Sequence, residues 1–138
     1  MQQRDIIQDQ IEQLGRVLGK LIANFFSLKT TREVRSAIEI TNTQLKSQLG
    51  IDIENLLSLS FLEKEAYIKS KHLTAEHLDK LAIYFYEIGN AKDASLEKED
   101  RLRWFTAAKE MIDLVEKYSN IFTFERMNLK DEIDKELA

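Results

Sequence analysis

The sequence predicts an all-α protein of six or seven helices, packed as antiparallel helical hairpins. Its 138 residues contain no proline and only four glycines. Both residues interrupt helices, so their scarcity favours long, unbroken ones. Apolar residues recur every three or four positions through most of the chain, and no alternating strand pattern of useful length is present. With 43% hydrophobic and 32% charged residues, the chain suits one globular domain with its own core.

The first helix is predicted over residues 5–26. Its apolar side chains follow each other in alternating steps of four and three residues, the spacing that lets one helix pack lengthwise against another. They are Ile7, Ile11, Leu14, Leu18, Leu21 and Phe25.

A strip of small residues, Gly15, Gly19 and Ala23, lies beside these apolar side chains. A glycine costs a helix about 1 kcal/mol relative to alanine, so two of them one turn apart indicate that another helix approaches closely. That helix is either a neighbour in the same chain or part of a second copy. In the second case Gly15, Gly19 and Ala23 form the self-association seam of a homodimer.

The next three helices are predicted from the residues at their ends. Thr30 to Glu33 fit the capping box, in which a hydroxyl and a carboxylate three residues later each accept a backbone amide. The helix that follows stops at Gly50, because glycine readily adopts the left-handed conformation. Asp52 caps a short helical turn, and Ser60 to Glu63 form a second capping box that opens another helix.

Three more helices are predicted in the C-terminal half. Thr74 caps the first, which Gly89 and Asn90 close, and a polar, exposed loop over residues 92–100 follows. The next helix presents one apolar face, made of Leu102, Phe105, Ala108, Ile112 and Val115.

Thr123 caps the last helix, whose inward residues include Met127, Ile133 and Leu137. We therefore expect one domain over residues 1–138. It consists of N-terminal helices in 1–70, a hairpin in 73–118 and a C-terminal capping helix in 123–137.

The first helix of this hairpin resembles the first helix of a tetratricopeptide repeat. The resemblance rests on the order of two large residues, a small one, an aromatic one and a glycine along one stripe. These are Leu78, Leu81, Ala82, Phe85 and Gly89.

The second helix of the hairpin follows the repeat pattern less closely. Ala94 lies at the expected offset, but Lys98 and Arg101 differ from the aromatic and small residues of the repeat. The pattern returns about seven residues later with Phe105 and Ala108. The resemblance, over about a third of the chain, therefore implies a repeat-like hairpin with a lengthened turn.

The whole chain also resembles a family of small uncharacterised bacterial helical proteins with a repeat-like C-terminal half. Four stretches carry this resemblance: Arg4 to Ile7, Ile11 to Leu14, Leu49 to Asp52 and Phe122 to Arg126. It implies an all-helical fold and no particular activity.

In a tetratricopeptide-like hairpin, one face of the first helix lines a groove. The residues on that face here are Glu76, Asp79, Ile83, Tyr86 and Glu87. They combine acidic groups with two apolar anchors, which suits a basic or aliphatic peptide. Repeats that bind a terminal carboxylate carry Lys and Asn where this chain has Asp79 and Ile83, which disfavours that mode. The alternative is that the N-terminal helices cover Ile83 and Tyr86 as part of the core.

The sequence shows no catalytic or metal-binding constellation. His72 and His77 are the only histidines; five residues apart on a helix, they point about 140° from each other and cannot share a metal. We expect both to be solvated or capping. Cysteine is absent, and neither a glycine-rich phosphate loop nor a nucleophile beside a base is recognisable. We therefore expect no metal, no cofactor and no enzymatic activity.

Charge and hydropathy limit the partners. The net charge is −4, with seven basic and five acidic side chains in residues 1–50 and thirteen and nineteen in residues 51–138. Such dispersed cations do not form the basic stripe that nucleic acids require. The most apolar run, 17–28, is shorter than the roughly 20 residues that span a membrane. We expect no nucleic-acid or membrane partner and a cytoplasmic location.

These features favour a protein-interaction or assembly module that binds a protein or peptide partner, as a monomer or as a homodimer. The mechanism would be a peptide or helix lying on the face that contains Ile83 and Tyr86. Two alternatives remain at this stage. One is a small-molecule-binding or enzymatic bundle with a pocket between helices, and the other is a structural homodimer.

Overall fold

The computed structural model describes residues 2–138, with side chains from Ile7 onward. This part of the chain contains seven α-helices and no strand. The all-α prediction is confirmed. The helices are α1 (Gln2–Leu28), α2 (Val34–Leu49), α3 (Ile53–Ser58), α4 (Phe61–Ser70), α5 (Ala75–Gly89), α6 (Lys98–Tyr118) and α7 (Phe124–Leu137).

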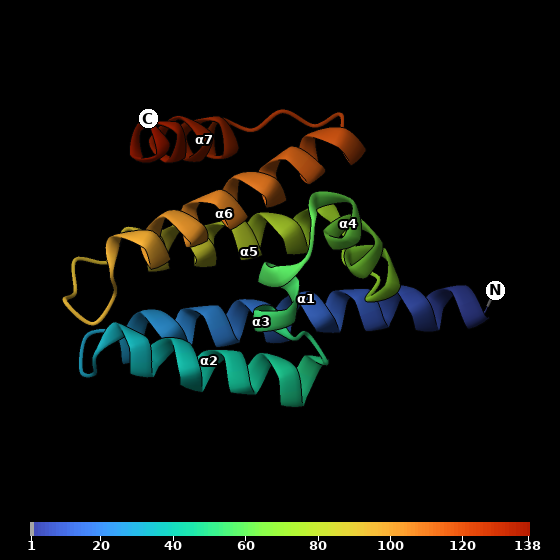
Figure 1. Ribbon diagram of the computed structural model, residues 1–138. Helices are drawn as coiled ribbons and strands as arrows, with labels where there is room; N and C mark the ends of the chain where they lie inside the picture. The colour runs from blue at the N-terminus through green and yellow to red at the C-terminus, as the bar shows by residue number, and fades with distance from the viewer. Residues whose placement is uncertain (1) are drawn as a thin grey trace.

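The helices are stacked in layers (Figure 1). The antiparallel pair α1 and α2 forms one layer, the antiparallel pair α5 and α6 lies across it, and α7 packs on the outer side of the second pair. The short helices α3 and α4 connect the two pairs at one end. α5 is the central element, because it contacts α1, α6 and α7.

The core lies between the two pairs and within the α5–α6 pair. Phe25 of α1 meets Tyr84 of α5 edge to face, with ring centroids 5.1 Å apart, and Trp104 of α6 packs beside Phe85. All five positions of the repeat-like stripe in α5 are buried. The apolar face predicted for α6 is buried as well, except for the half-buried Leu102.

α6 crosses α5 very closely at Gly89. A Cβ on Gly89 would lie 2.9 Å from Cδ1 of Phe105 and 3.1 Å from the backbone oxygen of Arg101. The Arg101 side chain donates from Nε to the Gly89 carbonyl at 3.0 Å, which fixes the crossing. Only a residue without a side chain allows this approach.

Most of the predicted caps are confirmed. Gly50 ends α2 with a φ of 68°, in the left-handed region. Asp52 accepts the amide of Asn55, and both hydrogen bonds of the Ser60–Glu63 capping box are present. These ends use residues adjacent in sequence, which is why the sequence predicts them.

The capping box predicted at Thr30 to Glu33 is wrong. The hydroxyls of Thr30 and Thr31 donate backwards to the carbonyls of Ser27 and Leu28, at the end of α1. Glu33 is the N-cap of α2 and makes no side-chain cap bond. These hydroxyls therefore bond carbonyls at the end of one helix instead of amides at the start of the next.

The connection between α5 and α6 caps α2 instead. Asp93 Oδ2 accepts the Val34 amide at 2.9 Å, and Ser95 Oγ accepts the Arg35 amide at 3.3 Å. The Arg35 guanidinium also donates to the Ser95 carbonyl, at 3.0 Å. The polar stretch 92–100 is therefore not simply an exposed loop: it is attached to α2, and Leu96 within it is buried.

α7 presents a different inward face from the predicted one. Ile133 is buried as predicted and Leu137 packs against the core, but Met127 is 40% exposed. The side chain of Arg126, only 9% exposed, is turned inward in its place. The reason is Asp79 of α5, whose carboxylate binds the Arg126 guanidinium through two hydrogen bonds of 2.9 Å each.

Candidate functional site

A groove runs between α5 and α7 on the surface of the molecule and has a volume of about 470 Å³. We call it the α5–α7 groove. One side is the face of α5 that carries Asp79, Ile83, Tyr86 and Glu87, and the other is the start and middle of α7, from Thr123 to Glu132. Four of the five residues that the sequence predicts for a partner-binding face thus line one groove.

The fifth predicted residue, Glu76, lies outside this groove. Its carboxylate is 3.5 Å from Lys80 Nζ, one helical turn further along α5. Both side chains line a separate, polar hollow between α1 and α5. Glu76 precedes Asp79 by about one turn along α5 and points about 60° away from it around the helix axis, on the side of Lys80 and α1.

The floor of the groove is apolar. Ile83 is 43% exposed, so the N-terminal helices do not cover it. Leu129 and Tyr86 are half-buried beside it, and both pack against the core. The Tyr86 ring lies against Phe105 of α6, with centroids 5.8 Å apart. The floor is therefore supported from behind while Ile83 stays open to solvent.

The rim of the groove is acidic. Glu87 of α5 and Glu125 and Glu132 of α7 all line the groove. Burial, and then the negative charges of Glu132, Glu87 and Glu136, raise the pKa of the Tyr86 hydroxyl. Two of these carboxylates have cationic neighbours in half-exposed or exposed pairs, Glu87 with Lys29 and Glu132 with Lys135. Exposed pairs of this kind are weak and exchange partners readily.

Arg126 closes one end of the groove. Besides its two hydrogen bonds to Asp79, it donates from Nη1 to the Ile121 carbonyl at 2.7 Å. This one side chain joins α5, α7 and the turn before α7. Asp79, predicted as an acidic contact for a partner, is therefore already neutralised within the chain.

The strip Gly15, Gly19 and Ala23 is partly occupied by α5 of the same chain. A Cβ on Gly15 would lie 3.3 Å from His77 Nε2, and one on Gly19 would lie 3.7 Å from Lys80 Cε. Lys80 Nζ also donates to the Gly15 carbonyl at 3.2 Å. Ala23, by contrast, is exposed. The close approach of α5 therefore accounts for Gly15, whereas a Cβ on Gly19 would make only ordinary van der Waals contact with Lys80.

His77 is a structural link between α1 and α5. It is 2% exposed; its Nδ1 accepts the Thr74 amide at 2.9 Å, and its Nε2 lies 3.0 Å from the Ile11 carbonyl. This network assigns the proton to Nε2. Burial, and to a smaller extent the charge of Lys80, lowers the pKa of His77 against the opposing effect of the Ile11 hydrogen bond. His77 is thus a capping histidine, one of the two roles predicted for it.

His72 lies in the turn after α4. It is exposed, and its φ of 58° places it in the left-handed region. It is therefore not on a helix with His77. Among the residues that the structure describes, no three His, Cys, Asp or Glu side chains come close enough together to hold a metal ion.

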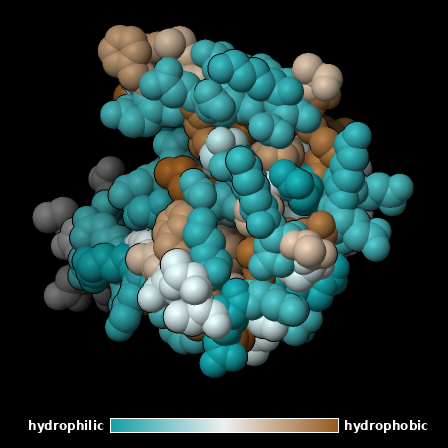
Figure 2. Space-filling view, turned by 90° about the vertical axis from the view of Figure 1, so that its left-hand side faces the viewer, coloured by the Kyte–Doolittle hydropathy of each residue, from teal (hydrophilic) through white to brown (hydrophobic). Residues whose placement is uncertain are grey.

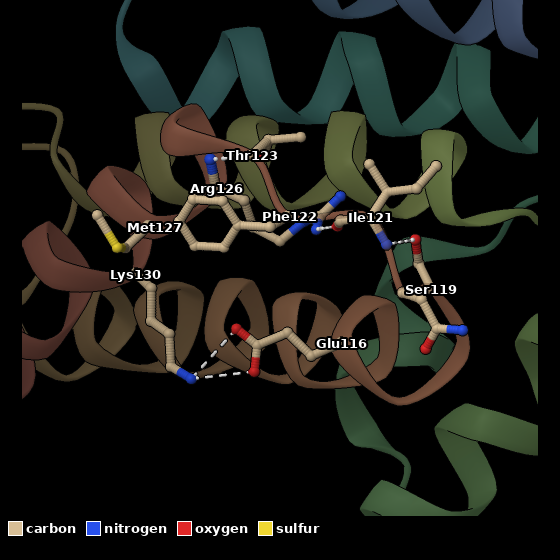
Figure 3. A pocket seen from close by; sticks show the side chains of 9 residues that line it. Glu116, Ser119, Ile121, Phe122, Thr123, Arg126, Met127 and Lys130 are labelled. Carbon is tan, nitrogen blue, oxygen red and sulfur yellow. Dashed lines mark hydrogen bonds and ion pairs between the residues drawn. The ribbon is translucent and has the colours of Figure 1, made fainter.

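Sequence reasoning missed a second surface, which we call the aromatic turn (residues 119–127). Ile121, Phe122 and Phe124 are each 64% to 70% exposed, and the two phenylalanine rings meet edge to face with centroids 5.4 Å apart. The turn encloses a hollow of about 320 Å³ beside the Glu116–Lys130 ion pair (Figure 3). The signal in the sequence was a run of apolar residues outside any amphipathic stripe.

The aromatic turn and the α5–α7 groove form one continuous surface. Thr123 and Arg126 line both hollows, so the turn begins where the groove ends. Figure 2 shows the end of the molecule opposite the aromatic turn. Its surface is mostly hydrophilic, and apolar side chains are visible beneath the hydrophilic outer surface of the uppermost layer. Of the exposed large apolar side chains, Tyr118, Ile121, Phe122, Phe124 and Met127 lie in or directly beside the aromatic turn.

Comparisons of the chain with protein-family models, with curated proteins and with solved structures each returned no match. Within residues 2–138, no helix is both long enough and apolar enough to cross a membrane. The resemblance to tetratricopeptide repeats and to small bacterial helical proteins stays a prediction.

Proposed function

We propose that this protein is a protein-interaction module and that its α5–α7 groove binds a segment of a partner protein. The observation that carries the proposal is the exposed apolar floor around Ile83 beneath the acidic rim of Glu87, Glu125 and Glu132. An aliphatic side chain of the partner would fill the floor, and lysine or arginine residues beside it would face the rim. The groove is open to solvent and is not an enclosed cavity, so a protein segment can enter it.

The arrangement of helices supports the same proposal. Helical-repeat proteins stack short units of helices so that each unit packs on its neighbour, and the stack creates an extended concave binding surface. α5, α6 and α7 have this order here. Relative to the sequence-based proposal, the acidic contacts shift from Glu76 and Asp79 of α5 to Glu125 and Glu132 of α7.

The test is an affinity pull-down from lysate of the source organism, read by mass spectrometry, with wild type, Ile83→Lys and Leu62→Lys. Leu62 is the matched control, because it is 74% exposed on α4 and lies outside the groove. We expect a protein that wild type and Leu62→Lys recover and Ile83→Lys loses, since a lysine on the floor removes the apolar contact. Circular dichroism must show that all three are equally folded.

The same variants decide against the proposal in two ways. If Ile83→Lys recovers the same proteins as wild type, the groove is not the binding site. If wild type recovers no protein that depends on Ile83 at any salt concentration, the chain is not an interaction module of this kind.

A further inference from the structure

The two helices that form the α5–α7 groove run in the same direction. Near the start of both, Asp79 binds Arg126; further along both, Tyr86 lies close enough to Glu132 and Glu136 to feel their charges. Figure 1 shows the same arrangement, with the C-terminal ends of α5 and α7 at one end of the molecule. The groove therefore has two chemically different ends.

The end at the C-termini of the two helices is negative. Each helix terminus contributes roughly half a negative charge from its unpaired carbonyls. At this end the α7 terminus lies beside Glu87, Glu132 and Glu136, whose charges all act on Tyr86. Arg101 binds the Gly89 carbonyl at the α5 terminus. Lys29 and Lys135 pair with Glu87 and Glu132, but these pairs are exposed or half-exposed and a cationic partner can displace them. A partner would place its positive groups at this end.

The other end is apolar and close to neutral. Asp79 is compensated by Arg126, and the charge of Glu125 lies at the positive N-terminus of α7. Directly beyond it, the aromatic turn exposes Ile121, Phe122 and Phe124. A partner would place apolar side chains here.

The groove also favours a helical partner over an extended one. An extended segment needs donors and acceptors for its own backbone. The backbone groups of α5 and α7 are bonded within their helices, and the Thr123 hydroxyl already accepts the Arg126 amide. A helix satisfies its backbone internally and needs only an apolar stripe, as in other helix-in-groove complexes.

From these observations we infer that the segment bound in the α5–α7 groove is an amphipathic helix, antiparallel to α5 and α7, with basic residues in its N-terminal half and apolar residues in its C-terminal half. The inference rests on the proposed function of the groove. In this orientation the positive N-terminus of the bound helix meets the acidic end of the groove at the α7 terminus, and its apolar C-terminal half covers Ile83 and the aromatic turn.

The absence of cysteine from the chain makes this orientation measurable by disulfide trapping. Two variants place one thiol near each end of the groove, both at exposed positions. Glu125→Cys lies on the groove wall at the start of α7, and Glu136→Cys lies one helical turn beyond the last lining residue, Glu132. The probe is a synthetic amphipathic peptide of about 18 residues, roughly 27 Å long as a helix. Its binding stripe has lysines in the N-terminal half and leucine and phenylalanine in the C-terminal half, and it is made with a cysteine at either end.

We expect the peptide with an N-terminal cysteine to cross-link to Glu136→Cys about fivefold more than to Glu125→Cys, because binding raises the local thiol concentration. The peptide with a C-terminal cysteine should show the opposite preference. Adding Ile83→Lys to either variant should remove the preference.

Each other result contradicts the inference in a recognisable way. Equal or reversed preferences that still disappear with Ile83→Lys overturn the orientation and leave the proposed function standing. No cross-linking at either position overturns the basic amphipathic helix as the ligand, and the pull-down then decides the proposed function separately. Cross-linking that Ile83→Lys does not change, together with an unchanged pull-down, removes both.

Discussion

Single residues set the distances between the helices of this protein. Gly89 and Gly19 are both glycines in helical segments, but their surroundings differ. A Cβ on Gly89 would lie 2.9 Å from the Phe105 ring, and one on Gly19 would meet nothing closer than 3.7 Å. The sequence shows both as small residues, and only the neighbouring helix shows which of them must stay small.

We expect opposite effects of alanine at these two positions. Gly89→Ala should destabilise the protein by about 1–3 kcal/mol, because the methyl group would press on Phe105 and on the Arg101 backbone. Gly19→Ala should stabilise it by about 0.5–1 kcal/mol through higher helix propensity. Urea unfolding followed by circular dichroism measures both. Equal changes in the two variants would show that the close crossing at Gly89 is absent.

His77 makes the contact between α1 and α5 sensitive to pH. Protonation of Nδ1 would set an N–H against the Thr74 amide that it now accepts. The pKa of His77 is lowered in the folded protein, so the unfolded chain binds the proton more tightly. Its contribution is fully present above the unfolded pKa of about 6.5 and is lost as the pH falls below that value.

We therefore expect the free energy of unfolding to decrease between pH 7.5 and pH 5.5, and His77→Gln to reduce that decrease. Glutamine is the control because it does not titrate in this range. Lys80 and Glu76 are the charged groups that act on His77, and both are unchanged in His77→Gln. An identical pH dependence in wild type and His77→Gln would exclude His77 as its source.

At the scale of elements, helix ends are predictable where the cap lies nearby in sequence and unpredictable where it comes from elsewhere. Gly50, Asp52 and Ser60 act on their own helices. The start of α2 depends on Asp93, 59 residues away from Val34. Local patterns contain no information about such a partner, so the threonines before α2 were wrongly assigned as its cap.

α7 is held by ion pairs more than by apolar burial. Ile133 is its only fully buried side chain, and salt bridges join it to the rest of the molecule, Arg126 with Asp79, Lys130 with Glu116 and Lys109 with Asp134. A sequence pattern based on apolar residues therefore predicts that α7 exists but places its inward face incorrectly at Met127.

Replacing Arg126 should loosen α7 selectively. Arg126→Met leaves the half-buried Asp79 carboxylate without its partner. We expect the free energy of unfolding to fall by about 1–3 kcal/mol. This is less than the cost of breaking a fully buried pair, because the Asp79 side chain is 34% exposed. Hydrogen exchange should accelerate in α7 before it does so in α5 and α6. Lys135→Met, which breaks an exposed pair, is the control and should change stability by less than about 0.5 kcal/mol. Unchanged exchange in Arg126→Met would contradict this account of how α7 is held.

At the scale of the whole molecule, the fold class and half of the candidate site followed from the sequence. The 3.6-residue periodicity predicted the helices, and the face of α5 from Asp79 to Glu87 was correctly singled out as a surface. The second wall of the groove was not predicted, because it depends on α7 docking through Arg126. The aromatic turn was missed because exposed apolar residues between helices follow no periodic pattern.

Because Asp93 caps α2, the start of this helix is synthesised before the residue that caps it. A ribosome adds about 5–20 residues per second, so the first turn of α2 emerges seconds before the carboxylate that will bind its amide, 59 residues later in the chain. The interval between the synthesis of Ile11 and that of His77, whose ring contacts the Ile11 carbonyl, is longer still, because His77 follows Ile11 by 66 residues. During synthesis α1 and α2 are therefore not a finished half of the protein. These two contacts of α1 and α2 form only after the segment from α5 to the start of α6 has been made.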